Sequence, residues 1–156
     1  MSDLDLLKDK LILAGKILVA QGQDDFTRGH ISVRLPDNPS LFLMKPHSIG
    51  FDELTRENIL TIDLEGKVVA GQGRRHSEVF IHSEIFRARP DVQSVIHSHP
   101  AYATALSATG RPIRAFSQPG ALFHGALDTY DASMRLLDFV RRACAPRPSQ
   151  RKSSRT

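Results

Sequence analysis

Residues 92–100 read Val-Gln-Ser-Val-Ile-His-Ser-His-Pro, a short apolar run that leads directly into two histidines and a proline. The apolar residues predict a buried strand over 92–96, and Pro100 ends it because proline has no amide hydrogen for a strand ladder. Side chains two apart on an extended chain point to one face, so His97 and His99 can reach a single cation. Surface or capping histidines are the alternative interpretation of such a pair.

A helix is predicted just upstream, starting near Ser77 and stopped by Pro90. Backbone amides at a helix start favour an anion, and Arg75 and His76 add donors beside them, so a carboxylate or phosphate can dock there. Glu78 in the first turn is either an acid/base residue or an ordinary helix-stabilising carboxylate.

The rest of the chain alternates strands with helices. We expect strands over 29–35, 41–44, 59–62, 67–69 and 113–116, and helices over 3–20, 101–108 and 129–143. Short turns join neighbouring strands as hairpins, so the sheet is at least partly antiparallel. This order favours one α/β or α+β domain over a helix bundle or a β-sandwich.

Two further segments place hydrogen-bond donors at strand ends. They are Gly29-His30-Ile31-Ser32 and Lys45-Pro46-His47-Ser48, and both suit an anionic substrate, although neither is specific alone. His82, one turn beyond Glu78, is interpreted as a hydrogen-bonded packing residue.

The composition is that of one globular domain. The chain has 156 residues, of which 40% are hydrophobic and 24% charged. Its longest apolar runs fall far short of the ~20 residues of a membrane helix, so we expect no membrane partner. The acidic N-terminus lacks the order of a secretory signal, so we expect a cytoplasmic protein. Cys144, the single cysteine, can form neither an internal disulfide nor a thiolate metal site.

The positive charge lies at one end of the chain. The net charge is +4, but residues 141–156 hold six basic residues and no acid, which leaves 15 basic against 17 acidic residues elsewhere. Residues 144–156 are therefore expected to form a disordered basic tail. Nucleic-acid binding by this tail is a third hypothesis, and short basic tails are usually solvated chain ends instead.

Six short motifs follow one another in a fixed order along the chain. They read Gly29-His30-Ile31-Ser32, Pro46-His47-Ser48-Ile49-Gly50, Asp63-Leu64-Glu65-Gly66-Lys67-Val68, His76-Ser77-Glu78, Arg89-Pro90-Asp91 and His97-Ser98-His99-Pro100. In order and spacing they resemble the class II aldolase and adducin head-domain family, which includes fuculose-phosphate aldolases. The resemblance implies a three-layer α/β/α fold with a mainly antiparallel central sheet over residues 1–143. It also implies a homo-oligomer, usually a tetramer.

The resemblance also implies roles for individual residues. His97 and His99 are similar to two of three histidine ligands of a catalytic divalent metal, usually zinc, with manganese or cobalt as alternatives. Glu78 is similar to the family's acid/base carboxylate. The residues expected to bind an anionic substrate are Gly29, His30, Ser32, His47, Ser48, His76 and Ser77.

The implied activity is that of a metal-dependent lyase that cleaves a carbon–carbon bond through a stabilised carbanion or enolate. The reaction is a retro-aldol cleavage or a decarboxylation, and the substrate is a small carboxylate or a sugar phosphate. His30 and His76 stand where the family has asparagine and serine. With these two histidines the sequence resembles the branch of the family that decarboxylates hydroxypyridine carboxylates. This resemblance favours decarboxylation.

The third metal histidine of the family has no counterpart here. It lies in an Asn-His-Gly loop that nothing after Phe123 matches, and the proline-, serine- and arginine-rich ending looks like a truncation or a change of reading frame. His124 is one substitute ligand, and Glu78 with His97 and His99 is a three-ligand alternative. The missing histidine motivates a second hypothesis, a non-catalytic adducin-like module for oligomerisation or binding.

Overall fold

The computed structural model describes residues 2–124 and residue 138. Its strands are β1 (His30–Arg34), β2 (Leu41–Met44), β3 (Leu60–Asp63), β4 (Val68–Ala70) and β5 (Ser94–His97). Its helices are α1 (Asp3–Ala20), α2 (Val79–Ala88), α3 (Ala101–Ala108) and α4 (Gln118–Phe123).

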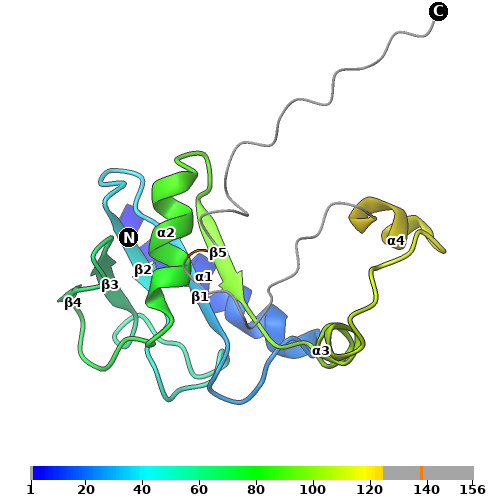
Figure 1. Ribbon diagram of the computed structural model, residues 1–156. Coiled ribbons are helices and arrows are strands. Elements are labelled where there is room, and N and C mark those ends of the chain that lie inside the picture. The colour runs from blue at the N-terminus through cyan, green and yellow to red at the C-terminus, as the bar shows by residue number, and fades with distance from the viewer. Residues whose placement is uncertain (1, 125–137, 139–156) are drawn as a thin grey trace, which may run out of the picture.

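The five strands form one sheet in the order β4-β3-β2-β1-β5, and every neighbouring pair is antiparallel. Helix α1 covers one face of the sheet and α2 covers the other (Figure 1). The expected three-layer α/β/α fold with a mainly antiparallel central sheet is therefore confirmed. Strand β5 lies at one edge of this sheet.

Each face of the sheet has its own apolar core. The core on the α2 face consists of Phe42, Met44, Leu60, Ile62, Val79, Phe86 and Val95. The core on the α1 face consists of Leu11, Ile31, Leu43, Phe51, Leu54 and Ile59. Successive residues of β2 alternate between the two cores, because side chains along a strand point to opposite faces. Burial on both faces makes this strand the centre of the fold.

Helix α1 begins at a capping box. The Ser2 hydroxyl accepts a hydrogen bond from the amide of Asp5, and the Asp5 carboxylate accepts one from the amide of Ser2. The helix predicted over 3–20 is confirmed. Leu11 on this helix packs into the core of the α1 face.

Strand β1 has two unlike faces. Ile31 and Val33 join the apolar core under α1. His30, Ser32 and Arg34 lie under α2, and all three are buried. The Arg34 guanidinium reaches across the layer and donates to the backbone carbonyls of Pro39, Phe86, Arg89 and Val92. Polar side chains therefore connect β1 to α2, where apolar contacts would be usual.

Three predictions of secondary structure need correction. The strand predicted over 113–116 is wrong: this segment has no ladder partner among the described residues. Helix α4 was not predicted, although Ser117 caps it by accepting from the amide of Gly120. The helix predicted from Ser77 begins two residues later, at Val79. The helix predicted over 129–143 and the boundary between 143 and 144 lie outside the described residues, residue 138 excepted.

Helices α3 and α4 stand beside the sheet and do not cover it (Figure 1). Neither helix buries a residue. Tyr102, Phe116 and Leu122 expose 93%, 85% and 76% of their surface, which is unusual for large apolar side chains. No helix within the part of the chain that the structure describes combines the length and apolarity needed to cross a membrane.

Candidate metal centre

The centre forms where β1, β5 and the start of α2 meet. His30 and His97 are partners in the antiparallel register of β1 and β5, so their side chains lie on the same face of the sheet. Their rings stack with centroids 4.5 Å apart and an interplanar angle of 11°. This face is the one that α2 covers, so the helix start is brought above both rings.

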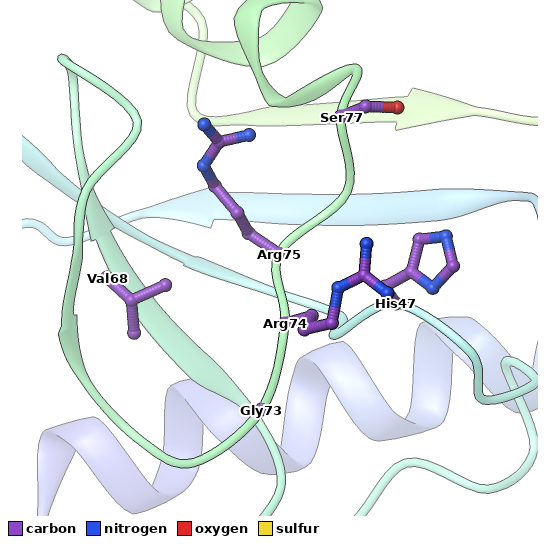
Figure 2. A pocket seen from close by; sticks show the side chains of 6 residues that line it. All are labelled: His47, Val68, Gly73, Arg74, Arg75 and Ser77. Carbon is purple, nitrogen blue, oxygen red and sulfur yellow. The ribbon is translucent and has the colours of Figure 1, made fainter.

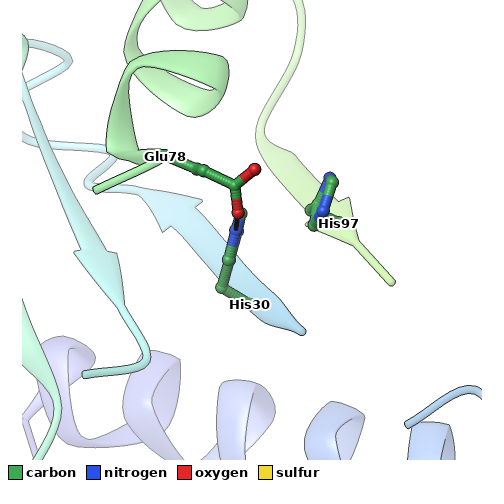
Figure 3. Close-up of side chains that lie close together, drawn as sticks. All are labelled: His30, Glu78 and His97. Carbon is green, nitrogen blue, oxygen red and sulfur yellow. Dashed lines mark hydrogen bonds and ion pairs between the residues drawn. The ribbon is translucent and has the colours of Figure 1, made fainter. Parts of the chain in front are cut away.

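Glu78 completes a group of three possible metal ligands. Its carboxylate Oε2 lies 3.4 Å from Nε2 of His30. One ligand atom from each of His30, Glu78 and His97 lies within 4.8 Å of the others. Figure 3 shows the carboxylate of Glu78 pointing toward the His30 ring, with His97 on the neighbouring strand. Two imidazoles and one carboxylate are a donor set that zinc accepts.

His99 adjoins this group through His97. The Nε2 atoms of His97 and His99 face each other at 2.9 Å, so the spacing of two residues brings the two rings into contact. Nδ1 of His99 lies 3.0 Å from Oδ2 of Asp25. A carboxylate on the far ring nitrogen keeps the proton on Nδ1 and leaves Nε2 as a lone pair, which is the usual arrangement behind a metal-binding histidine.

Asp25 was not predicted from the sequence. It lies in the polar segment before β1, and no motif singles it out from Asp24 beside it. The useful signal is chemical: a metal histidine calls for a carboxylate or carbonyl on its second nitrogen. Position alone could not show which acid supplies it.

The spacing of the nitrogen atoms fits a divalent cation. Two imidazoles on one tetrahedral zinc ion, each at about 2.0–2.1 Å, place their nitrogens about 3.3 Å apart. The Nε2 atoms of His97 and His99 are 2.9 Å apart, so a small movement of either ring gives this separation. Burial lowers the pKa of His97, an effect that Glu78 opposes and His99 reinforces. The neutral imidazole, which is the form that binds metals, is therefore the resting form of His97.

Behind the ligand group lies a buried polar layer. His82 of α2 places Nε2 at 2.6 Å from Nδ1 of His30 and Nδ1 at 2.6 Å from the hydroxyl of Ser32. All three side chains are fully buried. Burial lowers the pKa of His82 to about 3 and also lowers that of His30. The interpretation of His82 as a hydrogen-bonded packing residue is confirmed.

His76 links this layer to the surface. Its ring lies 4.6 Å from that of His30 and 5.1 Å from that of His47, measured between centroids. Its Nε2 lies 3.1 Å from the carbonyl of Pro46, to which it donates a hydrogen bond. Burial, with the charge of Lys45 as the second cause, lowers the pKa of His76 to about 4. His76 therefore braces a loop and is not exposed to a ligand.

Lys45 is a second residue whose importance the sequence did not show. Its ammonium is buried and donates to the carbonyls of Thr27, Pro46 and Ile49. Burial lowers its pKa to about 8, and Glu53 opposes this effect. Lys45 thus ties the segment before β1 to the loop after β2.

A pocket of about 450 Å³ opens beside the start of α2. It is lined by His47, Val68, Gly73, Arg74, Arg75 and Ser77. Figure 2 shows the side chains of His47 and Arg74 next to each other, whereas Arg75 extends to the other side of the loop. Cationic and hydroxyl donors around one opening suit an anion.

Of the predicted anion-binding residues, His47 and Ser77 line this pocket, and Ser48 is hydrogen-bonded to His47. The others lie elsewhere: His30, Ser32 and His76 are buried in the polar layer. Close packing explains the glycine at position 29, because a Cβ there would lie 2.6 Å from the Phe51 ring.

His124 lies away from the centre. It is the C-cap residue of α4, a helix that stands beside the sheet and does not cover it (Figure 1), and its Nδ1 donates to the carbonyl of Ile113. The group of possible ligands among residues 2–124 does not include it. The structure thus gives no support to His124 as a substitute third ligand.

Comparisons with known proteins agree with this architecture. The chain matches Class II Aldolase and Adducin N-terminal domain over residues 9–145. An L-fuculose 1-phosphate aldolase from Glaciozyma antarctica PI12 is 32% identical, with a TM-score of 0.72 over 79% of this chain and 51% of that one. An aldolase II superfamily protein from Pseudomonas syringae is 28% identical, with a TM-score of 0.80 over 93% of this chain and 61% of that one.

The L-fuculose-1-phosphate aldolase from Thermus thermophilus is 27% identical, with a TM-score of 0.61 over 79% of this chain and 60% of that one. The chain therefore spans about half of the first of these structures and about 60% of the other two. The matched residues include every strand of the sheet and all the side chains of the candidate centre. The chain belongs to the class II aldolase and adducin N-terminal domain family.

Proposed function

We propose that this chain is a metal-dependent carbon–carbon lyase of the class II aldolase type. The observation that carries the proposal is the pair of facing Nε2 atoms of His97 and His99, 2.9 Å apart. Because Nδ1–H of His99 donates a hydrogen bond to the Asp25 carboxylate, Nε2 of His99 presents a lone pair to the gap. Such a gap is stable only when a proton or a cation lies in it.

The residues that would hold the cation are Glu78 and His97, which form a group of possible ligands with His30, and His99, which lies outside that group but whose Nε2 faces that of His97. When bound, a divalent cation supplies Lewis-acid stabilisation of negative charge that develops on the substrate. The side chain of Glu78 is 44% exposed, so its carboxylate can reach a substrate. We assign it the transfer of a proton to or from the reacting carbon.

The pocket beside α2 orients the substrate. Its donors His47, Arg74 and Ser77 bind an anionic group, and Ser77 is the chain neighbour of Glu78. An anionic group held there places the rest of a small molecule beside the carboxylate. L-fuculose 1-phosphate is the first substrate to test, since two of the similar structures are named for it. Planar hydroxy-carboxylates are the second class, which would make the reaction a decarboxylation.

Calorimetric titration with zinc, manganese and cobalt tests the site before any substrate is known. We expect His97→Ala and His99→Ala each to weaken binding of the preferred metal by at least about a hundredfold. His124→Ala is the matched control and should bind like the wild type, because it removes a histidine outside the centre. Unchanged affinity in both His97→Ala and His99→Ala contradicts the assignment.

Turnover tests the role of Glu78. Glu78→Gln keeps an oxygen donor but cannot accept a proton, so we expect it to retain the metal and to lose turnover by about 10²–10⁴-fold. Release of an aldehyde from L-fuculose 1-phosphate and release of carbon dioxide from hydroxy-carboxylates are the two assays. A Glu78→Gln enzyme as active as the wild type would remove Glu78 from the reaction.

A second candidate is a non-catalytic module for self-association. It is favoured by the exposed apolar side chains of Tyr102, Phe116 and Leu122, which a second copy could cover. Sedimentation velocity of the wild type and of Tyr102→Ser/Phe116→Ser tests it, and a metal-loaded oligomer with no turnover on either substrate class supports this candidate. We propose a homo-oligomer in either case. A monomer at all concentrations contradicts that part.

A further inference from the structure

A chain of hydrogen bonds leads from Ser32 to Glu78 through two buried imidazoles. The Ser32 hydroxyl lies 2.6 Å from Nδ1 of His82, and Nε2 of His82 lies 2.6 Å from Nδ1 of His30. Nε2 of His30 then lies 3.4 Å from Oε2 of Glu78. The first three side chains are fully buried, so water does not replace any of these partners. Each proton position in this chain depends on its neighbours.

Two proton orders satisfy the imidazole pair. In the first, Ser32 donates to His82, Nε2–H of His82 donates to His30, and the proton of His30 is on Nε2, facing Glu78. In the second, every donor is reversed, and Nε2 of His30 is a bare lone pair. A neutral imidazole carries one ring proton, so the two orders cannot mix within the chain. The order decides whether His30 can bind a cation.

Contacts at both ends of this hydrogen-bond chain, at Ser32 and at Glu78, favour the first proton order. Among the residues that the structure describes, His82 Nδ1 is the hydrogen-bond partner of the Ser32 hydroxyl, and no second acceptor accompanies it. In the second order the buried hydroxyl proton has no acceptor, which disfavours that order by roughly tenfold or more. At the other end, a bare Nε2 would face the carboxylate of Glu78, and two acceptors repel each other.

We infer that Ser32 and His82 hold His30 as its Nε2–H tautomer, which makes His30 a hydrogen-bond donor to Glu78 and not a ligand of the cation. His97 and His99 are then the imidazole ligands, and His30 orients the carboxylate of Glu78. Ser32 and His82 are positioning residues, since they act only through His30. The tautomer is a property of the metal-free protein, whereas the statement about ligands rests on the proposed function.

The tautomer is measured directly in metal-free, ¹⁵N-labelled protein. Long-range ¹H–¹⁵N correlation spectra of imidazoles distinguish a protonated Nε2 from a protonated Nδ1. We expect His30 and His82 both to carry their proton on Nε2 at neutral pH. Protons on Nδ1 of both rings would overturn the inference, whatever the metal site does. This measurement needs no variant.

Ser32→Ala tests the cause of the tautomer. Removal of the hydroxyl takes away the donor to His82 Nδ1 in the first order and the acceptor of Nδ1–H in the reversed order, so the two orders become closer in free energy. The Nδ1–H form of His82 should therefore rise, by up to roughly tenfold. Ser83→Ala is the matched control: Ser83 is the neighbour of His82, is also buried, and its hydroxyl has no hydrogen-bond partner within the described residues. Ser32→Thr keeps the hydroxyl and should keep the wild-type tautomer. Identical spectra for Ser32→Ala and Ser83→Ala would show that Ser32 does not set the tautomer of the two histidines.

Metal affinity tests the consequence for His30. Glutamine retains an N–H donor for Glu78, so His30→Gln should weaken zinc binding by no more than about tenfold, whereas His97→Gln should weaken it by at least about a hundredfold. Equal losses in the two variants would make His30 a ligand and overturn the inference. Unchanged affinity in both would contradict the proposed function, while the tautomer spectra would still decide the inference.

Discussion

Alternate residues of β1 face opposite sides of the sheet, and the two sides are held by different kinds of contact. Toward α1, Ile31 and Val33 pack among apolar side chains. Toward α2, His30, Ser32 and Arg34 are buried too, and each is held by hydrogen bonds. Apolar burial stabilises in proportion to area and in any direction, whereas a buried polar contact adds little net free energy but accepts only one geometry.

The polar contacts, and not the apolar ones, fix the position of α2 relative to β1. Layers held by apolar contacts tolerate small shifts, but His30, Ser32 and His82 lose their partners if α2 moves relative to β1. The apolar face therefore supplies stability, and the polar face fixes the start of α2, next to Glu78. Variants and conditions that act on one face only can separate these two contributions.

Acid should break the polar face first. The pKa of His82 is lowered to about 3 and that of His76 to about 4, both mainly by burial, so the unfolded chain binds more protons than the folded one below pH 6.5. The stability is complete above pH 6.5 and is lost as the pH falls. For the metal-free protein we expect the free energy of unfolding to drop by several kcal/mol between pH 7 and pH 4.5.

Urea denaturation at a series of pH values measures this loss. His124→Ala, which removes an exposed histidine, should leave the slope unchanged, and a flat profile from pH 7 to pH 4.5 would contradict the buried neutral state. The charged or titratable groups that face the two rings are His30, Lys45, His47 and His97.

Arg34→Leu should also destabilise the polar face of β1, at the end of the strand opposite His30. The guanidinium donates to four backbone carbonyls and lies over the Phe86 ring, so its removal leaves buried acceptors without donors. We expect a loss of about 4 kcal/mol in the free energy of unfolding. Arg28→Leu is the control, because the Arg28 side chain is 78% exposed and should change stability by less than about 0.5 kcal/mol. Similar midpoints in urea for both variants would contradict the role of Arg34.

Ile31→Ala acts on the opposite face of the same strand. The change opens a cavity in the core under α1, and we expect a loss of about 3 kcal/mol in the free energy of unfolding. Zinc affinity of the folded protein should stay within about twofold of wild type, since the Ile31 side chain packs on the face away from the centre. A large loss of zinc affinity would show that the two faces are coupled. Calorimetry below the unfolding transition decides between these outcomes.

Asp9→Asn removes an exposed ion pair that belongs to neither face of β1. Asp9 pairs with Arg56, but both side chains are more than a third exposed, so the pair is screened by water. We expect a loss of less than about 1 kcal/mol in urea denaturation, and no change in zinc affinity. A loss as large as that of Arg34→Leu would mean that exposure is a poor guide to the energetics of this chain.

Local patterns predicted most of the fold because they are set by neighbours in the chain. The helix at 3–20, the strands of the sheet and the His97–His99 pair all follow from spacing, capping and alternation. The predicted strand at 113–116 failed because an apolar run needs a neighbouring strand to become part of a sheet. The roles of Glu78, His97 and His99 in metal binding stay predictions.

What the sequence could not show depends on contacts between distant segments. Asp25 lies beside His99 only because the segment before β1 folds back to the end of β5, and Arg34 finds its acceptors on α2 and the segment that follows it. Lys45 looks like an ordinary loop lysine until the loop closes around its ammonium. The motif at 29–32 predicts that His30 binds substrate, and nothing in the sequence connects it with His82, which is more than fifty positions away.

Strand β5 is the last strand of the described sheet, so one row of its backbone N–H and C=O groups faces away from β1. Such an outer row is a template on which another strand can be added. The candidate centre sits at the end of this strand, at His97. Any segment that extends the sheet there therefore also becomes a wall of the centre, and access to the cation is tied to how the outermost strand is paired.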